Sequence, residues 1–263
     1  MSNLPRELLD HIVDLLHGSK TPLRNCSLVS KSWVARTRTH LFAEVHFQTT
    51  ESLESWKKTF PDPSTSPARY AKALSVGCPR VVTAADGDSG RWIAAFSRVE
   101  RLELGGRELH ARGWEVAFAL FYGFSPAVKS IHMRWSSLPF SRFLYLILTF
   151  PLLEDVTMIN CHDGPPTDGD HSDWLSTADQ SQNLPMFTGS LELLLRGGMG
   201  LIVDRLLSLP NGIHFRKLIL SWFCEEDVSL TMALVEKCSP TLESLDVSCN
   251  SCGTFTGHLG LHG

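Results

Sequence analysis

The segment VERLELGGREL, residues 99–109, carries apolar side chains at its first, fourth, sixth and eleventh positions. Polar and apolar residues alternate over 101–104, which is the pattern of a strand with one buried face. The same template returns several times along the chain. It fits Ala71, Leu74, Val76 and Val81; Val128, Ile131, Met133 and Leu138; Leu153, Val156 and Met158; Phe215, Leu218 and Leu220; and Leu242, Leu245, Val247 and Cys252, with a weaker copy centred on Leu193 and Leu195.

These copies are regularly spaced. Their fourth positions fall at residues 74, 102, 131, 156, 193, 218 and 245, so neighbouring copies lie 25 to 29 residues apart except for one interval of 37. This is the pattern and period of leucine-rich repeats, which stack because no single unit can bury its own apolar face. Helices are expected between the strands, near residues 92–96, 116–121, 143–147, 202–207 and 228–235. The sequence therefore predicts an irregular solenoid of parallel strands alternating with helices over residues 71–263.

The one long interval is explained by residues 160–188, which hold five aspartates and no Lys or Arg. We interpret this segment as an acidic surface loop. A different fold is open for the repeat region as a whole, namely a generic α/β domain with a parallel sheet.

The first forty residues predict a small helical module. Pro5 suits a first helical turn because its φ is already helical, and Gly18 is expected to supply a left-handed stop, which gives a helix over 5–17. Thr21 and Pro22 repeat the start signal for a second helix. The apolar positions of the first helix are Leu8, Leu9, Ile12, Val13, Leu15 and Leu16. A module of about forty residues rarely buries that much apolar surface alone, so part of it should be an interface.

At these residues the chain resembles the F-box, the helical module that docks on the Skp-type adaptor of cullin-RING ubiquitin ligases. The match runs from Leu4 to Phe42, and it departs from the family at Thr21 and Pro22, where an acidic residue is common, and at Ser30, where cysteine is frequent. The matching residues are Leu4, Pro5, Leu8, Leu9, Ile12 and Leu16 in the first half and Val29, Ser30, Lys31 and Trp33 in the second. The whole chain, from Leu4 to about Cys252, resembles an F-box protein with degenerate leucine-rich repeats.

The resemblance implies an F-box at 1–45, a linker at 46–70 and a repeat solenoid at 71–263. It also implies a non-catalytic subunit that binds the adaptor, and through it a cullin, and recruits an unknown protein target for ubiquitin transfer. Docking is expected to rest on Leu4, Pro5, Leu8, Leu9, Ile12, Leu16, Leu28, Val29 and Trp33. Strand alternation selects the outward residues for the target, foremost Arg101, His132, Arg134, Arg196 and Lys217.

Two other interpretations of the N-terminal module remain. It could be an amphipathic bundle that merely caps the repeats, which would make the protein a leucine-rich scaffold with no ligase role. It could also be a DNA-binding helix-turn-helix, because Lys31, Arg36 and Arg38 follow a short turn. Residues 1–45 hold six Lys or Arg and four Asp or Glu, and this net charge of +2 is low for phosphate binding.

The composition favours a folded protein without a polyanionic partner. The formal net charge is −4, which points to neither nucleic acid nor an anionic membrane surface. The most apolar segment, Phe143–Leu153, is too short to cross a bilayer, and acidic residues interrupt the leucines where a signal peptide would need an apolar core. Seven scattered cysteines fit free thiols, so we expect a cytoplasmic or nuclear location.

No constellation in the sequence proposes catalysis or a cofactor. Cys249 and Cys252 form a CxxC, but Cys252 falls on an inward position of the last repeat, and there is no second CxxC. The aspartates from Asp168 to Asp179 lack the glycine and the bidentate glutamate of a calcium loop. The chain has no GxSxG, P-loop or HExxH motif, so neither a metal, a cofactor nor a catalytic residue is expected.

Overall fold

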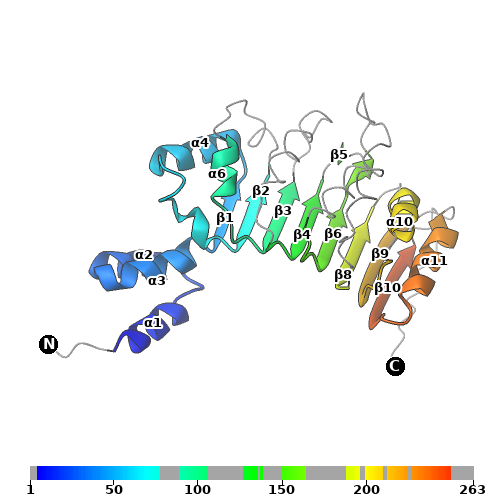
Figure 1. Cartoon of the computed structure of the whole chain (residues 1–263), viewed down its shortest axis with the longest axis horizontal. Helices are drawn as coiled ribbons and strands as arrows, with labels where there is room; N and C mark the ends of the chain where they lie inside the picture. The colour runs from blue at the N-terminus through cyan, green and yellow to red at the C-terminus, as the bar shows by residue number, and fades with distance from the viewer. Residues whose placement is uncertain are drawn as a thin grey trace.

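The computed structural model describes residues 5–77, 89–105, 127–135, 137–138, 150–163, 188–195, 199–209, 212–223 and 227–249. In these residues three helices are followed by a parallel sheet of eight strands with helices between them, which agrees with the predicted α/β character. Figure 1 shows the strands side by side in a row from β1 to β10, with the three N-terminal helices beyond the β1 end.

The N-terminal helices are α1 (Arg6–Leu15), α2 (Lys20–Val29) and α3 (Lys31–Leu41). Both α1 and α2 pack against α3. The side chains that this packing buries completely are Val13, Leu23 and Thr37, one from each helix. The last helix begins where the Ser30 hydroxyl oxygen accepts a hydrogen bond from the backbone N–H of Ser32, an N-cap. The module therefore has a small core with one apolar contribution each from α1 and α2.

The end of α1 differs from the predicted one. The helix ends at Leu15, and the turn after it is closed by backbone bonds from His17 to Asp14 and from Ser19 to Leu16. Gly18 has no left-handed backbone; among the described glycines only Gly212 has a positive φ, 71°. The prediction of a left-handed stop was wrong because tight turns of the i to i+3 type satisfy these carbonyl groups instead.

The large sheet contains eight strands, and every adjacent pair is parallel. The strands follow one another across the sheet in chain order: β1 (Glu44–Phe47), β2 (Ala73–Val76), β3 (Arg101–Gly105), β4 (Ser130–Arg134), β6 (Asp155–Ile159), β8 (Ser190–Leu194), β9 (Lys217–Phe223) and β10 (Ser244–Cys249). A second, two-stranded sheet pairs β5 (Ser137–Leu138) with β7 (His162–Asp163). Such an order gives each unit contacts mainly with the units before and after it.

Two apolar rows run across the large sheet on its core-facing side. The register aligns the first row as Val45, Leu74, Leu102, Ile131, Val156, Leu191, Leu218 and Leu245, and the second as Phe47, Val76, Leu104, Met133, Met158, Leu193, Leu220 and Val247. All are buried except Leu245 and Val247 in β10, which are half-buried. The strand positions predicted from the template are thus confirmed. The weak copy was misplaced by two residues, because its fourth and sixth positions are Leu191 and Leu193.

The segment predicted to be a linker, 46–70, is instead part of the packed structure. It contains half of β1, then α4 (Thr50–Thr59) and the 3₁₀ helix η1 (Pro67–Tyr70). Trp56 of α4 explains why: its ring centroid lies 5.7 Å from that of Phe47 and 5.9 Å from that of Phe96. Pro61 and Pro63 lie between α4 and η1, and Pro67 begins η1.

Apart from α1, α2 and α3, the described helices lie near the two ends of the row of strands (Figure 1). Besides α4 they are α6 (Ser89–Ala94), α10 (Met199–Leu207) and α11 (Val228–Cys238), at three of the predicted places. One continuous core joins the strand rows to Leu53 of α4, Leu206 of α10 and Leu234 of α11. The helices predicted near 116–121 and 143–147, the acidic loop beyond Asp163 and the C-terminal residues from 250 onward lie outside the described residues.

Candidate functional site

The structure leaves much of the N-terminal apolar surface uncovered. Leu8 is 51% exposed and Ile12 40% exposed on α1, while Leu28 is 84% and Val29 72% exposed at the end of α2. The other predicted docking residues divide into an exposed Pro5 and the half-buried Leu9, Leu16 and Trp33. Leu4 lies outside the described residues. Exposed apolar side chains therefore lie on two helices that share α3 as their support.

One further exposed apolar residue of α1 was not among the predicted docking residues. Leu15 is 70% exposed and follows Leu8 by seven positions and Ile12 by three. Helical spacing places residues at these offsets on one face, so the sequence held the signal that could have found it. Val13, in contrast, points to the core and is 1% exposed. We define the docking stripe as Leu8, Ile12, Leu15, Leu28 and Val29.

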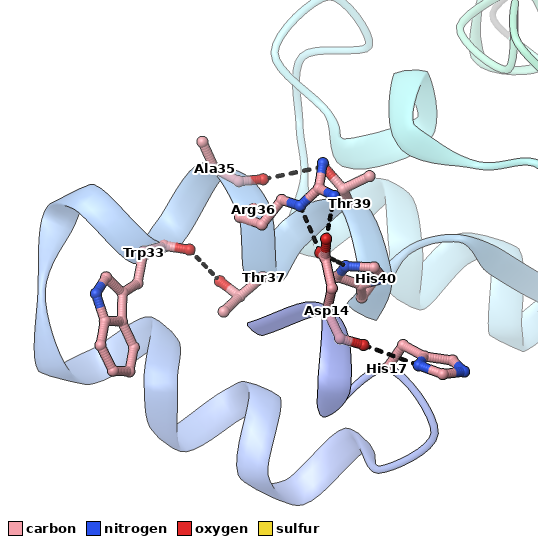
Figure 2. Close-up of polar contacts among 8 residues, drawn as sticks. All are labelled: Asp14, His17, Trp33, Ala35, Arg36, Thr37, Thr39 and His40. Carbon is pink, nitrogen blue, oxygen red and sulfur yellow. Dashed lines mark hydrogen bonds and ion pairs between the residues drawn. The ribbon is translucent and has the colours of Figure 1, made fainter. Parts of the chain in front are cut away.

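A polar cluster fixes the position of α1 on α3 (Figure 2). The Arg36 guanidinium donates to both carboxylate oxygens of Asp14, from Nε at 2.6 Å and from Nη2 at 2.5 Å. His40 Nε2 lies 2.7 Å from Asp14 Oδ1. The hydrogen bonds from Arg36 hold the pKa of the Asp14 carboxyl far below its ordinary value. This cluster ties the helix that carries Leu8 to the supporting helix.

The same cluster bears on the helix-turn-helix alternative. Arg36 was one of three cations considered for phosphate binding, and its charge is compensated by Asp14. Lys31 and Arg38 are exposed.

Figure 2 also shows the Thr37 hydroxyl donating to the Trp33 carbonyl oxygen, at 2.9 Å, which satisfies this buried polar group within α3.

The face of the large sheet opposite the core carries the residues predicted for target binding. Arg101 and Lys217 belong to one row across the strands, and His132 belongs to the next row, between Glu103 and Thr157. Arg134 is two residues further along β4 than His132. The structure therefore places four of the five predicted residues on one face, and Arg196 lies outside the described residues. We call this surface the polar face.

Ion pairs occupy one side of the polar face. Arg101 Nη2 lies 2.8 Å from Glu44 Oε1, and its Nε lies 3.7 Å from Glu103 Oε1. In contrast, Arg134 and Lys217 form no ion pair with any residue of the described ranges. His132 is half-buried and its Nε2 is 2.9 Å from the Ser130 hydroxyl. Burial lowers the pKa of His132, because the charged imidazolium loses hydration there.

A hollow of about 410 Å³ opens on the polar face at the carboxyl ends of β2, β3 and β4. It is lined by Gln48, Ser75, Gly77, Glu103, Leu104, Gly105, His132, Arg134 and Trp135. His132 and Arg134 were predicted from the sequence to face a target, whereas Trp135, a residue that is 49% exposed, was not. Trp135 could have been noticed in the sequence, because it directly follows a predicted strand at a position where the repeat template has no apolar residue.

The described residues show no alternative site for metal chemistry. Among them no three His, Cys, Asp or Glu side chains are grouped as a metal site requires. Cys161 is fully buried beside the Ile159 carbonyl oxygen. Cys252 of the CxxC and the aspartates from 168 to 179 lie outside the described ranges. No helix in the part of the chain described here is long and apolar enough to cross a membrane.

Comparison with known proteins gives no assignment. No protein-family model matches the chain, and no curated protein has a significantly similar sequence.

Proposed function

We propose that this protein is the substrate-recognition subunit of an SCF-type ubiquitin ligase. Its N-terminal helices act as an F-box that docks on a Skp-type adaptor, and its strands and helices act as leucine-rich repeats that hold a protein target on the polar face. The single observation that carries the proposal is the docking stripe, because half of the ten large apolar residues exposed in the described chain lie on α1 and α2.

Burial energetics support a protein partner for the stripe. Covering an exposed leucine fully contributes about 1.5–3 kcal/mol, so covering Leu15 and Leu28 alone offers a substantial part of a binding energy. Folded proteins keep large apolar patches for partners, since such patches otherwise promote aggregation. Four of the stripe residues, Leu8, Ile12, Leu28 and Val29, are also among those selected from the F-box resemblance.

Sheet geometry supports the second half of the proposal. Strands in chain order with two buried apolar rows are what stacked repeats of 25 to 29 residues require. The observed β1 adds one more unit, since Val45 precedes Leu74 by 29 residues. Such stacks bind partners along an extended surface, and the polar face offers charged and hydrogen-bonding side chains from successive strands.

The experiment is co-expression of the full chain with a Skp-type adaptor, followed by affinity purification. A double variant, Leu8→Asp with Leu28→Asp, is expected to lose the adaptor, since it places charges on both parts of the stripe. The matched control is Leu201→Asp with Met232→Asp, on α10 and α11, where the native residues are 55% and 62% exposed. The control is expected to retain the adaptor.

A stability measurement separates lost docking from lost folding. Leu8 and Leu28 are exposed, so their substitution should leave the thermal unfolding midpoint nearly unchanged. Leu23→Ala removes a fully buried side chain and is expected to destabilise the module by about 2–5 kcal/mol. Retention of the adaptor by a folded Leu8→Asp, Leu28→Asp chain would show that the stripe is not the docking surface.

A second candidate function is a leucine-rich scaffold whose N-terminal helices cap the sheet. It is favoured by the close attachment of the helices, because α3 packs on η1 and the Ala43 carbonyl oxygen accepts hydrogen bonds from Lys72 and Ala73. A cap would need no adaptor. Absence of the adaptor from purified wild-type protein, together with target binding on the polar face, would favour this function.

A further inference from the structure

We infer that the hollow on the polar face binds a side-chain carboxylate of an acidic peptide segment, with the Arg134 guanidinium as its main donor. The inference rests on the proposed function in one respect, that the ligand of this face is a protein. It goes further by naming the chemical group that the hollow recognises and the residue that reads it.

Two of the residues that line the hollow are glycines, Gly77 and Gly105. Gly105 pairs with Arg134 across β3 and β4, and Gly77 directly follows β2. A methyl group at Gly77 would collide with the Gln48 side chain, and one at Gly105 would come within 3.4 Å of the Arg134 carbonyl oxygen. A larger residue at Gly77 would therefore displace the Gln48 side chain, which also lines the hollow.

The charges around the hollow favour a single negative charge on the ligand. Arg134 is exposed and forms no ion pair within the described residues, so its forked donor is available for a carboxylate. Glu103 is the diagonal neighbour of Arg134 on β3. It pairs with Arg101, which also pairs with Glu44. Glu103, Arg101 and Glu44 together carry a net charge of −1. This charge opposes a doubly charged phosphate more strongly than a carboxylate.

The available donors distinguish a side-chain carboxylate from a chain terminus. Terminal carboxylates are typically captured by clustered backbone N–H groups. Here the backbone N–H of Trp135 is bonded to the Ile159 carbonyl oxygen at 3.0 Å, and that of Gly77 to Phe47 at 2.8 Å. The side-chain amide of Gln48 and the hydroxyl of Ser75 have no intramolecular hydrogen bond within the described ranges. Side chains therefore provide the free donors of the hollow.

Trp135 provides an apolar contact next to the charge. Trp135 lines the hollow and is 49% exposed, so a bound peptide can cover its apolar surface. The hollow is open, whereas small-molecule pockets enclose their ligands. A peptide segment that crosses the strand ends fits this shape better than a cofactor does.

The test is selection of linear peptides from a random phage library on the immobilised full chain. We expect peptides selected by wild-type protein to share one Asp or Glu position, and Arg134→Gln to abolish that preference. Lys217→Gln is the matched control, since Lys217 is another cation of the polar face and forms no ion pair with the described residues. It lies on β9, four strands from β3, and the variant should select the same peptides as wild type. A synthetic consensus peptide is then measured by fluorescence anisotropy. Replacing the acidic residue of the peptide by Gln or Asn should weaken its binding to wild-type protein at least about tenfold. The same replacement should change binding to the Arg134→Gln variant little.

Several outcomes would overturn the inference: no peptide enriched by wild type, an acidic preference that survives Arg134→Gln, or tighter binding when phosphoserine replaces the acid. Unfolding midpoints equal to wild type within error are required of both variants, and Arg134→Lys should restore part of the preference if charge is what the site reads. Adaptor co-purification is measured on the same samples. Loss of the adaptor with intact peptide selection would refute only the proposed function, and the reverse result would refute only the inference.

Discussion

Trp135 and Asn160 occupy matching positions, each one residue beyond the end of adjacent strands, and both have a left-handed backbone with φ of 54° and 52°. Each uses its N–H to bond the next strand, Trp135 to Ile159 at 3.0 Å and Asn160 to Leu194 at 2.8 Å. Asparagine tolerates this conformation, while a bulky residue such as tryptophan is strained in it. The strained position is the one that lines the hollow.

Replacing Trp135 by Gly or by Val tests this strain. Both variants remove the indole ring, so their difference isolates the backbone. Glycine adopts a positive φ freely, whereas a β-branched side chain is opposed there, and we expect Trp135→Gly to be more stable than Trp135→Val by about 1–2 kcal/mol. Urea unfolding at equilibrium measures the difference. Equal stabilities would mean that residue 135 is not held in the left-handed region in solution.

Gly189 and Gly18 offer a second comparison. A methyl group at Gly189 would clash with the Glu154 carbonyl oxygen, a backbone atom that cannot move aside, while nothing lies within 4 Å of the position it would take at Gly18. Gly189→Ala is expected to destabilise the protein by about 1–3 kcal/mol because neighbouring strands must shift. Gly18→Ala should be neutral or stabilising by up to about 1 kcal/mol. Thermal unfolding of wild type and both variants measures whether each substitution lowers or raises the stability.

The sequence predicted the parts of the fold that repeat. Leu102 and Leu104 recur with a fixed spacing because each strand must bury the same two positions, so the core rows followed from periodicity alone. β1 was missed because Val45 and Phe47 are only two apolar residues placed directly after a helix. The stretch around Trp56 was not recognised as packed, since the contact that joins it to the repeat region is with Phe96, forty residues further along the chain.

The sites were predictable to different degrees. Alternation along a strand indicated that His132 and Arg134 face away from the core. It could not indicate the hollow, because that depends on which residues of the neighbouring strand, such as Gly105, lie beside Arg134. The exposure of Leu28 likewise depends on how α2 packs on α3, which helical spacing alone does not determine.

Removing the Asp14 carboxylate should loosen α1. Asp14→Asn loses the charge that accepts two hydrogen bonds from Arg36, and we expect a loss of stability at pH 7 of up to about 1 kcal/mol, since the pair is partly exposed. The folded state lowers the pKa of Asp14 below its value of about 3.9 in the unfolded chain. The stabilisation by the Asp14 carboxylate is therefore complete above that pH and declines as the pH falls below it.

Urea unfolding of wild type and Asp14→Asn at pH 7 and at pH 3 measures this prediction. The gap between the two proteins should narrow at the lower pH, because the unfolded wild-type chain takes up a proton at Asp14 that the folded chain binds poorly. Glu54→Gln is the control, since Glu54 pairs with Lys57 within a single helix and holds no two helices together. It should change stability by a few tenths of a kcal/mol. A gap that widens at pH 3 would contradict the assignment.

His132 should also make the stability of the protein fall as the pH falls, here through a base that burial keeps neutral. Burial lowers its folded pKa, with Glu103 and Glu192 opposing that shift and Arg134 and Arg101 adding to it. Below the unfolded value of about 6.5 the unfolded state therefore binds more protons than the folded state, and stability falls with the pH until the folded pKa is passed. We expect His132→Gln, which can keep a hydrogen bond to Ser130, to show a smaller fall between pH 7.5 and pH 5.5 in urea unfolding. A slope unchanged by the substitution would mean that other groups cause the dependence, and that the imidazole in the hollow is as free to ionise as one in water.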